Sequence, residues 1–235
     1  MSIPQAPWQR SRPSRPVKAA LSRDRIVDAA MELVVAEGYD AVSMRRVAQA
    51  LNTGAASLYA HVENKQELDQ LMLDRVAAQI VVPDPVPDKW QEQIIQVMHD
   101  LLATMRRYPG VARAAIGQIP LAENSLLTTE RILAILRAGG VPDWVAGYAV
   151  DLIPLYVCAI AFEEYVQRAS EWTSTDVEKY VTELAEWFRS LPAGRFPNIV
   201  ALAGAMTSGD GDDRFTFGTR VIVAGLASFG PEDKI

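Results

Sequence analysis

The chain has 235 residues but only one cysteine, Cys158, and two histidines, His61 and His99. A single cysteine excludes an internal disulfide framework. One thiol and two imidazoles, widely separated in the sequence, do not supply the Cys/His ligand cluster that a structural zinc site needs. We therefore expect no bound metal and no other cofactor.

The sequence also lacks the segments that bring a chain to a membrane. Residues 1–5 do not form a basic segment followed by an apolar one, and no run of 18 apolar residues follows. The composition is 49% hydrophobic and 22% charged, which is typical of a chain that fills a sizeable core. We expect a soluble cytoplasmic protein with no membrane partner.

The motifs of common enzyme classes are missing as well. No Gly-x-Ser-x-Gly sequence supplies a nucleophile, and His99 and Asp100 are helix neighbours that do not face each other. The aspartates around Gly209 and Gly211 resemble part of a calcium loop, but no glutamate stands at the twelfth position. Helix capping by Asp210 is the favoured alternative. We expect that the chain is not an enzyme.

Charge is distributed unevenly along the chain. Residues 1–65 hold nine Lys or Arg against six Asp or Glu, a net charge of +3, whereas the remaining residues carry a net charge of −9. Affinity for a polyanion is therefore expected near the N-terminus. Residues 1–20 contain four prolines and four basic residues, and we interpret them as a flexible basic arm that either tracks phosphates or serves only as a soluble tail.

Helical periodicity begins at Ser22 and continues along almost the whole chain, and no segment alternates as a strand does. The chain is therefore expected to be all-α. A proline cluster within 83–87 interrupts the pattern and marks a domain boundary. The spacings predict helices over about 22–37, 43–51, 54–61, 64–81, 88–108, 109–118, 123–138, 143–168, 175–191, 197–206 and 212–229.

The first three predicted helices have the lengths and short turns of a helix-turn-helix, whose last helix enters the major groove. Apolar, small and polar residues recur there at fixed spacings, in Ser22–Ile26 with Ala29–Ala30, in Gly38–Tyr39, in Ser43–Ala48, in Ser57–Val62, and in Asn64–Lys65 with Leu68. These segments resemble the N-terminal domain of TetR-family repressors. The resemblance implies a DNA-binding domain over 21–66, a connecting helix over 67–82 and a larger helical domain over 83–235.

The end of the chain is similar to the last helix of the tetracycline-repressor subgroup, through Arg214–Gly218 and Gly225–Leu226. In that subgroup the C-terminal domain binds a small molecule and dimerises through its two late long helices. The resemblance therefore implies a homodimeric repressor that binds a double-stranded DNA operator and is released by a small-molecule effector. A constitutive DNA-binding dimer without an effector is the alternative.

The family's DNA contacts fall on the second and third helices and on the start of the fourth. Carried over by position, they are Ser43, Arg45, Gly54, Ala55, Ala56, Ser57, Tyr59, His61 and Lys65. Arg45 can bond a guanine edge through two donors, and Tyr59 can hydrogen-bond a phosphate or a base. Ala55 and Ala56 favour contact with thymine methyl groups. For His61, phosphate contact and a packing or capping role are both open.

The segment 143–168 carries a wide apolar face rich in aromatic residues, and Pro154 is expected to kink it near Val150. A kinked aromatic helix beside a methionine-bearing helix fits a cavity for an apolar ligand, although the same side chains can simply fill the core. The candidate ligand-binding residues are Met98, Leu102, Met105, Trp144, Tyr148 and Tyr156. We expect a small hydrophobic or polycyclic effector, without magnesium coordination because His99 is the only imidazole of this domain.

Gly218 and Gly225 lie seven residues apart, on one face of the last predicted helix. Their missing side chains allow another helix to approach closely. This pattern favours a symmetric helix–helix interface with Tyr156 and Phe162 as aromatic partners. The expected dimer-interface residues are Phe162, Gly218 and Gly225.

Overall fold

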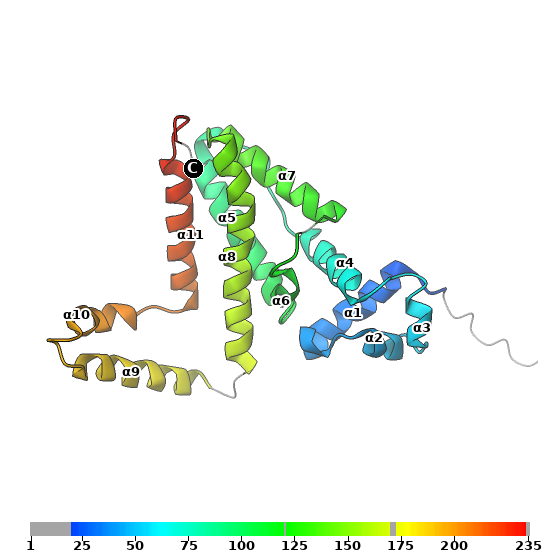
Figure 1. Ribbon diagram of the computed structural model, residues 1–235, viewed down its shortest axis with the longest axis horizontal. Helices are drawn as coiled ribbons and strands as arrows, with labels where there is room; N and C mark the ends of the chain where they lie inside the picture. Colours follow the sequence, from blue (N-terminus) through cyan, green and yellow to red (C-terminus); the bar gives the residue numbers. More distant parts are fainter. Residues whose placement is uncertain (1–19, 120, 170–172, 234–235) are drawn as a thin grey trace, which may run out of the picture.

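The computed structural model describes residues 20–119, 121–169 and 173–233, so the arm expected over 1–20 lies outside the described residues except for Ala20. Within these ranges the chain is helical and contains no strand, as predicted. A small group of helices at the N-terminal end is connected through α4 to a larger helical body (Figure 1).

Three of the four N-terminal helices begin at a side chain that caps them. The helices are α1 (Arg23–Glu37), α2 (Met44–Ala50), α3 (Ala55–Leu58) and α4 (Lys65–Ala77), with a short 3-10 turn, η2 (Tyr39–Ala41). Ser22, Ser43 and Asn64 each accept a hydrogen bond from a backbone N–H three residues later, which satisfies a donor that the first turn leaves unpaired. Asn52 turns the chain between α2 and α3 in the left-handed conformation, with φ at 51°.

The third helix is shorter than predicted. The pattern predicts a helix over about 54–61, whereas α3 ends at Leu58 and residues 59–61 form turns in which the N–H groups of His61 and Val62 both donate to the Leu58 carbonyl. The prediction over 64–81 also extends too far, because α4 ends at Ala77. Leu58 and Val62 are fully buried, so apolar spacing alone did not reveal where the helix stops.

The C-terminal body is a layer of long helices. Its elements are η3 (Pro87–Lys89), α5 (Trp90–Arg106), α6 (Ala112–Ala115), α7 (Glu123–Ala138), α8 (Asp143–Ala169), α9 (Ser174–Ser190), α10 (Pro197–Met206) and α11 (Gly211–Ser228). α5 packs against α7, α8 and α11, while α9 and α10 pack against each other and extend to one side from the ends of α8 and α11 (Figure 1). The predicted 109–118 helix is reduced to the single turn of α6.

One helix among the described residues, Asp143–Arg168 within α8, is long and apolar enough to cross a membrane by length and composition. In this fold α8 packs against α5, α7 and α11, and a third of its most apolar window (33%) is buried. The core helix of a soluble protein passes the same test, so this single helix is a weak indication of membrane insertion.

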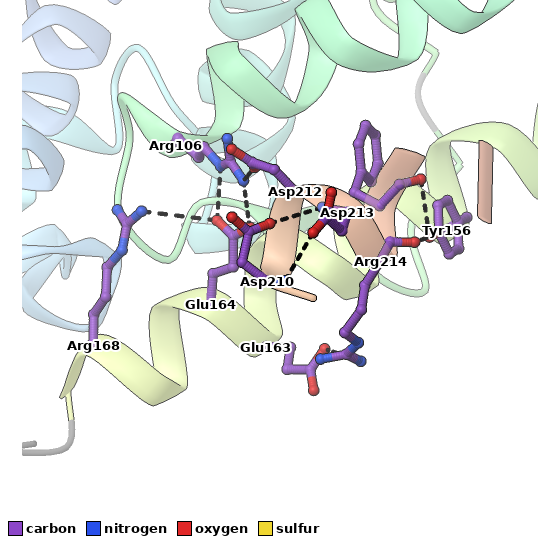
Figure 2. Close-up of polar contacts among 10 residues, drawn as sticks. Arg106, Tyr156, Glu163, Glu164, Arg168, Asp210, Asp212, Asp213 and Arg214 are labelled. Carbon is purple, nitrogen blue, oxygen red and sulfur yellow. Dashed lines mark hydrogen bonds and ion pairs between the residues drawn. The ribbon is translucent and has the colours of Figure 1, made fainter. Parts of the chain in front are cut away.

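A polar cluster attaches the start of α11 to the rest of the body (Figure 2). Arg106 of α5 donates to both carboxylate oxygens of Glu164 on α8, at 2.6 and 2.8 Å, and to Asp212 of α11 at 2.5 Å. The bonds to Glu164, and then that to Asp212, raise the pKa of Arg106, and in return Arg106 lowers the pKa of Asp212. Asp210 caps α11 by accepting from the Asp213 N–H, which confirms the capping role expected for it.

Replacing Arg106 with methionine is expected to lower the free energy of unfolding by about 1–3 kcal/mol, because it leaves the Glu164 carboxylate half-buried without its two-point partner. Arg137→Met is the matched control, since the Arg137–Asp143 pair is largely exposed and should contribute less than about 0.5 kcal/mol. Urea unfolding of both variants measures the difference. Equal losses in the two variants would show that the cluster does not hold α11.

Candidate functional site

The residues expected to contact DNA belong to the start of α2, to α3 and the turn that follows it, and to the start of α4. Exposed among them are Ser43, Arg45, Gly54, Ala56, Ser57 and Tyr59, whereas Ala55, His61 and Lys65 are partly buried. α2 and α3 pack against each other with Val47 and Leu58 fully buried, so their exposed residues lie on the solvent side of the pair. A surface of this kind presents side chains of two short helices to one groove.

Two adjacent arginines on α2 have different surroundings. Arg46 makes an ion pair with Glu37 at 2.5 Å, so its guanidinium is held against the end of α1. Arg45 is exposed and makes no ion pair with any residue in the described part of the chain. Of the two guanidinium groups, that of Arg45 is therefore the one available to a base edge or a phosphate.

Lys65 is held within the protein rather than extended to solvent. Its ammonium group bonds the buried carboxylate of Asp69 and the hydroxyl of Tyr39 at 3.0 Å, and it lies 4.3 Å from the centre of the Tyr39 ring. Burial raises the pKa of the Tyr39 hydroxyl, and the bond to Lys65 opposes that rise. These bonds fasten η2 to the start of α4, and a phosphate contact by Lys65 would have to compete with them.

Two other expected DNA contacts also have local structural partners. The Ser43 hydroxyl accepts from the Arg46 N–H at 3.2 Å and so caps α2. The backbone carbonyl of His61 accepts a hydrogen bond from the Arg23 side chain at 3.2 Å. A phosphate contact by the His61 imidazole stays a prediction.

A cavity of about 440 Å³ opens between α4, α5, α6, α7 and α8. Its wall is mostly aliphatic, with a few polar side chains. The lining residues are Leu73, Val76, Ala77, Ile80, Leu101, Met105, Ala115, Ile116, Gly117, Gln118, Ile119, Ser125, Thr128, Thr129, Ile132, Val150, Asp151, Ile153, Pro154, Leu155 and Cys158. A space of this size and lining suits a small, largely apolar molecule.

Of the six residues expected to bind a ligand, only Met105 lines this cavity. Met98 and Leu102 are buried core residues, as the alternative interpretation allowed. Tyr156 stacks on Phe215 of α11 with ring centres 5.7 Å apart, and Trp144 packs edge-on against Phe229 at 5.3 Å.

Tyr148 is exposed and packs edge-on against Trp144 with ring centres 6.4 Å apart. The expected aromatic lining of the cavity is thus corrected to an aliphatic one. Tyr156 and Trp144 of α8 pack on Phe215 and Phe229, whereas the cavity lies on the side of α8 that carries Val150, Pro154 and Cys158. Those three residues are spaced by four and therefore share a face, which is the sequence signal that could have indicated this wall.

Cys158 is a buried member of the cavity wall. Burial raises the pKa of its thiol to about 11, so the thiolate is scarce near neutral pH. The residue behaves as part of the apolar wall and not as a nucleophile.

The expected dimer residues divide into two groups. A side chain at Gly218 would collide with the Tyr156 ring and hydroxyl, so Gly218 allows α11 to pack on α8 within one chain. This contact corrects the expectation that Gly218 opens a surface to another subunit. At Gly225 an added carbon would meet no atom within 4 Å, and Phe162 is partly buried against the core.

Hydrogen bonds attach η2 to α6, to α8 and to the segment before α6. Arg113 of α6 donates to Asp40 of η2 at 2.6 Å, and the same carboxylate accepts from the Tyr165 hydroxyl of α8 at 3.0 Å. Burial, followed by the bond to Asp40, raises the pKa of Tyr165. The Tyr39 N–H donates to the Pro109 carbonyl at 2.8 Å. The elements α6 and α8, which also supply residues to the cavity wall, are thus bonded to η2.

The sequence matches two family profiles that together extend over most of the chain. Residues 26–70 match "Bacterial regulatory proteins, tetR family", and residues 82–229 match "Tetracyclin repressor-like, C-terminal domain". The chain belongs to the TetR family. Its helix-turn-helix and helical C-terminal domain are those of a TetR-family transcriptional repressor, and the family consists of regulators rather than enzymes.

Related TetR-family proteins resemble the chain over nearly its whole length. The HTH-type transcriptional repressor DrrR1 of Streptomyces coeruleorubidus is 34% identical over 218 residues, which cover 92% of this chain and 80% of DrrR1. The TetR family protein ActR of Streptomyces coelicolor, in complex with actinorhodin, is 42% identical with a TM-score of 0.82, over 91% of this chain and 99% of ActR. ActR in complex with (S)-DNPA gives a TM-score of 0.79 and covers 88% of this chain and 98% of ActR.

Proposed function

We propose that this chain is a homodimeric, cytoplasmic repressor that binds a palindromic operator and releases it when a small hydrophobic or polycyclic effector enters the 440 Å³ cavity. The observation that carries the proposal is the position of α4. This helix starts beside the DNA-contacting surface, and its Leu73, Val76 and Ala77 form part of the cavity wall. The binding of actinorhodin by ActR, which shares the fold, supports a small-molecule effector.

The release mechanism follows from differential affinity. An effector weakens operator binding only if it binds better to a conformation in which the two DNA-contacting surfaces of the dimer are wrongly placed. Two hydrogen bonds connect α6 and the loop after it with α4 and η2. Gln70 of α4 donates to Gln118 at 2.5 Å, and Arg113 of α6 donates to Asp40 at 2.6 Å. An effector that displaces α6 and the loop after it therefore moves both α4 and η2.

We place the dimer interface on α8 and α11, because the outer sides of these helices carry large apolar side chains that are exposed to solvent. Leu152 and Val166 of α8 are 44% and 52% exposed, and Phe217 and Val221 of α11 are 71% and 53% exposed. Side chains of this kind, gathered on two long helices of one body, are typical of an interface surface. Two copies related by a two-fold axis would bury them against each other.

Replacing Gly225 with leucine is expected to weaken the dimer, because a bulky side chain would stand on the α11 surface where two helices approach. Operator affinity should fall with it, since a monomer loses the second half-site. Gly194→Leu is the matched control, because an added side chain there also meets open space but lies outside α8 and α11. Sedimentation measures the oligomeric state, and an operator titration measures the affinity. A Gly225→Leu protein that stays dimeric and binds the operator with unchanged affinity would show that the interface lies elsewhere.

Selection from random double-stranded DNA tests the proposed operator. The dimer should recover an inverted repeat whose half-sites are centred about 34–36 Å apart or a multiple of that distance. Recovery of no inverted repeat would contradict the proposal. An operator that is bound but released by no small molecule would support the constitutive alternative, in which the C-terminal body serves dimerisation alone.

A further inference from the structure

Hydrogen-bond acceptors predominate among the polar side chains of the cavity. Asp151 is the one charged side chain among the described residues that line it, and no lysine, arginine or histidine stands in the wall. Asp151 lies on the exposed side of α8 and makes no hydrogen bond or ion pair with any described residue. The cavity therefore offers a ligand one carboxylate that has no partner within the described chain.

The hydroxyl groups of the wall also act as acceptors. Thr128 and Thr129 donate their protons to the carbonyls of Asn124 and Ser125, at 2.9 and 3.0 Å. A hydroxyl that has donated its only proton can still accept through its lone pairs. These two side chains can therefore accept hydrogen bonds from a ligand but cannot donate to it without breaking a bond to α7.

The backbone of α8 adds another acceptor. Pro154 has no N–H, so the Val150 carbonyl lacks the donor that an α-helix normally places four residues later. Val150, Asp151 and Pro154 all belong to the cavity wall. The Gln118 amide supplies the opposing donor, since its oxygen already accepts from Gln70. Acceptors nonetheless predominate beside an aliphatic surface.

We propose that the effector is a cationic amphiphile, an apolar and preferably polycyclic molecule with a protonated amine that pairs with Asp151. This inference rests on the proposed function, because it assigns the ligand class to the same cavity. A positively charged donor makes a charge-assisted hydrogen bond with the Asp151 carboxylate, while its ring system replaces water along the aliphatic wall. An anionic analogue meets the same carboxylate with like charge and finds no basic side chain to offset the repulsion.

Three anthraquinones of nearly equal size test the charge preference: 2-(aminomethyl)anthraquinone, 2-methylanthraquinone and anthraquinone-2-carboxylate. Binding to the full chain is followed by tryptophan fluorescence, and occupancy of the cavity is tested by the loss of binding in Thr128→Phe, whose ring would fill part of this space. We expect the amine to bind at least about fivefold more tightly than the methyl compound, and the carboxylate more weakly than both. In Asp151→Asn the advantage of the amine should disappear, whereas Asp143→Asn, at the exposed start of α8, should retain it.

The outcomes separate this inference from the proposed function. Equal affinities for the three compounds, or an amine preference that persists in Asp151→Asn, would overturn the charge assignment while leaving an effector cavity in place. Operator release by a compound that acts equally well on Thr128→Phe would overturn the assignment of the effector to this cavity. Comparing the urea unfolding of Asp151→Asn with that of the unsubstituted protein shows whether the substitution disturbs the structure. Weaker binding of the amine at higher salt is the independent sign of the ion pair.

Discussion

Replacement of Arg45 with alanine is expected to weaken operator binding by about 1–3 kcal/mol for each half-site and to relax the base preference at one position of each. The expectation follows from the exposure of Arg45 on α2 and from its freedom from ion pairs within the described residues. A guanidinium that is not engaged elsewhere can donate two parallel hydrogen bonds to one guanine. Because a dimer uses two half-sites, the loss applies twice per operator. Titration of a labelled operator at constant salt measures it.

Arg46→Ala is the matched control for this substitution. It removes the same charge from the neighbouring position, but Arg46 is paired with Glu37. We expect it to change affinity less than Arg45→Ala and to leave base preference unchanged. If both variants lose the same affinity for every sequence, Arg45 contributes a phosphate contact or a general charge and does not read a base.

Filling the cavity from α7 is expected to abolish induction while preserving repression. In Thr128→Phe the phenyl ring would occupy space that the effector needs, so effector affinity should fall by at least about tenfold. Operator affinity should change by less than about twofold, because Thr128 lies outside α4, α6 and η2, the elements through which we propose that the cavity acts on operator binding.

Thr182→Phe on α9 is the matched control, because it makes the same replacement of a helical threonine by phenylalanine. The Thr182 hydroxyl also donates to the carbonyl four residues earlier, at 2.9 Å, but this threonine lies outside the cavity wall. It should respond to effector as the unsubstituted protein does. Normal induction in Thr128→Phe would show that the effector binds somewhere other than this cavity.

Local sequence features predicted much of the fold. The helices α7, α10 and α11 begin and end within a residue of their predicted bounds, because apolar periodicity, capping residues and helix-breaking prolines act over short distances. Asp210 illustrates this, since its capping role depends only on residues three positions away. The short helix α3 was predicted too long because burial of Leu58 and Val62 continues through the turn that follows it.

The cavity could not be derived in the same way. Its wall comes from five different helices. Helical periodicity shows that Tyr156 and Met98 lie on apolar helix faces, but it does not show which residues they pack against. Tyr156 was assigned to a ligand, whereas it packs on Phe215 and excludes a side chain at Gly218. Lys65 is a similar case, because its bond to Asp69 is a local i, i+4 pair but its bond to Tyr39 depends on how η2 folds back on α4.

Effector and operator are expected to compete through the conformation of one dimer. The direct test is to measure the affinity of the tightest polycyclic binder for the free protein and for the protein saturated with operator. A typical coupling free energy of about 1–3 kcal/mol predicts that the operator weakens effector binding about 5- to 150-fold, and that the effector weakens operator binding by the same factor. Equal effector affinity in the two states would contradict the account and leave a dimer that binds DNA constitutively.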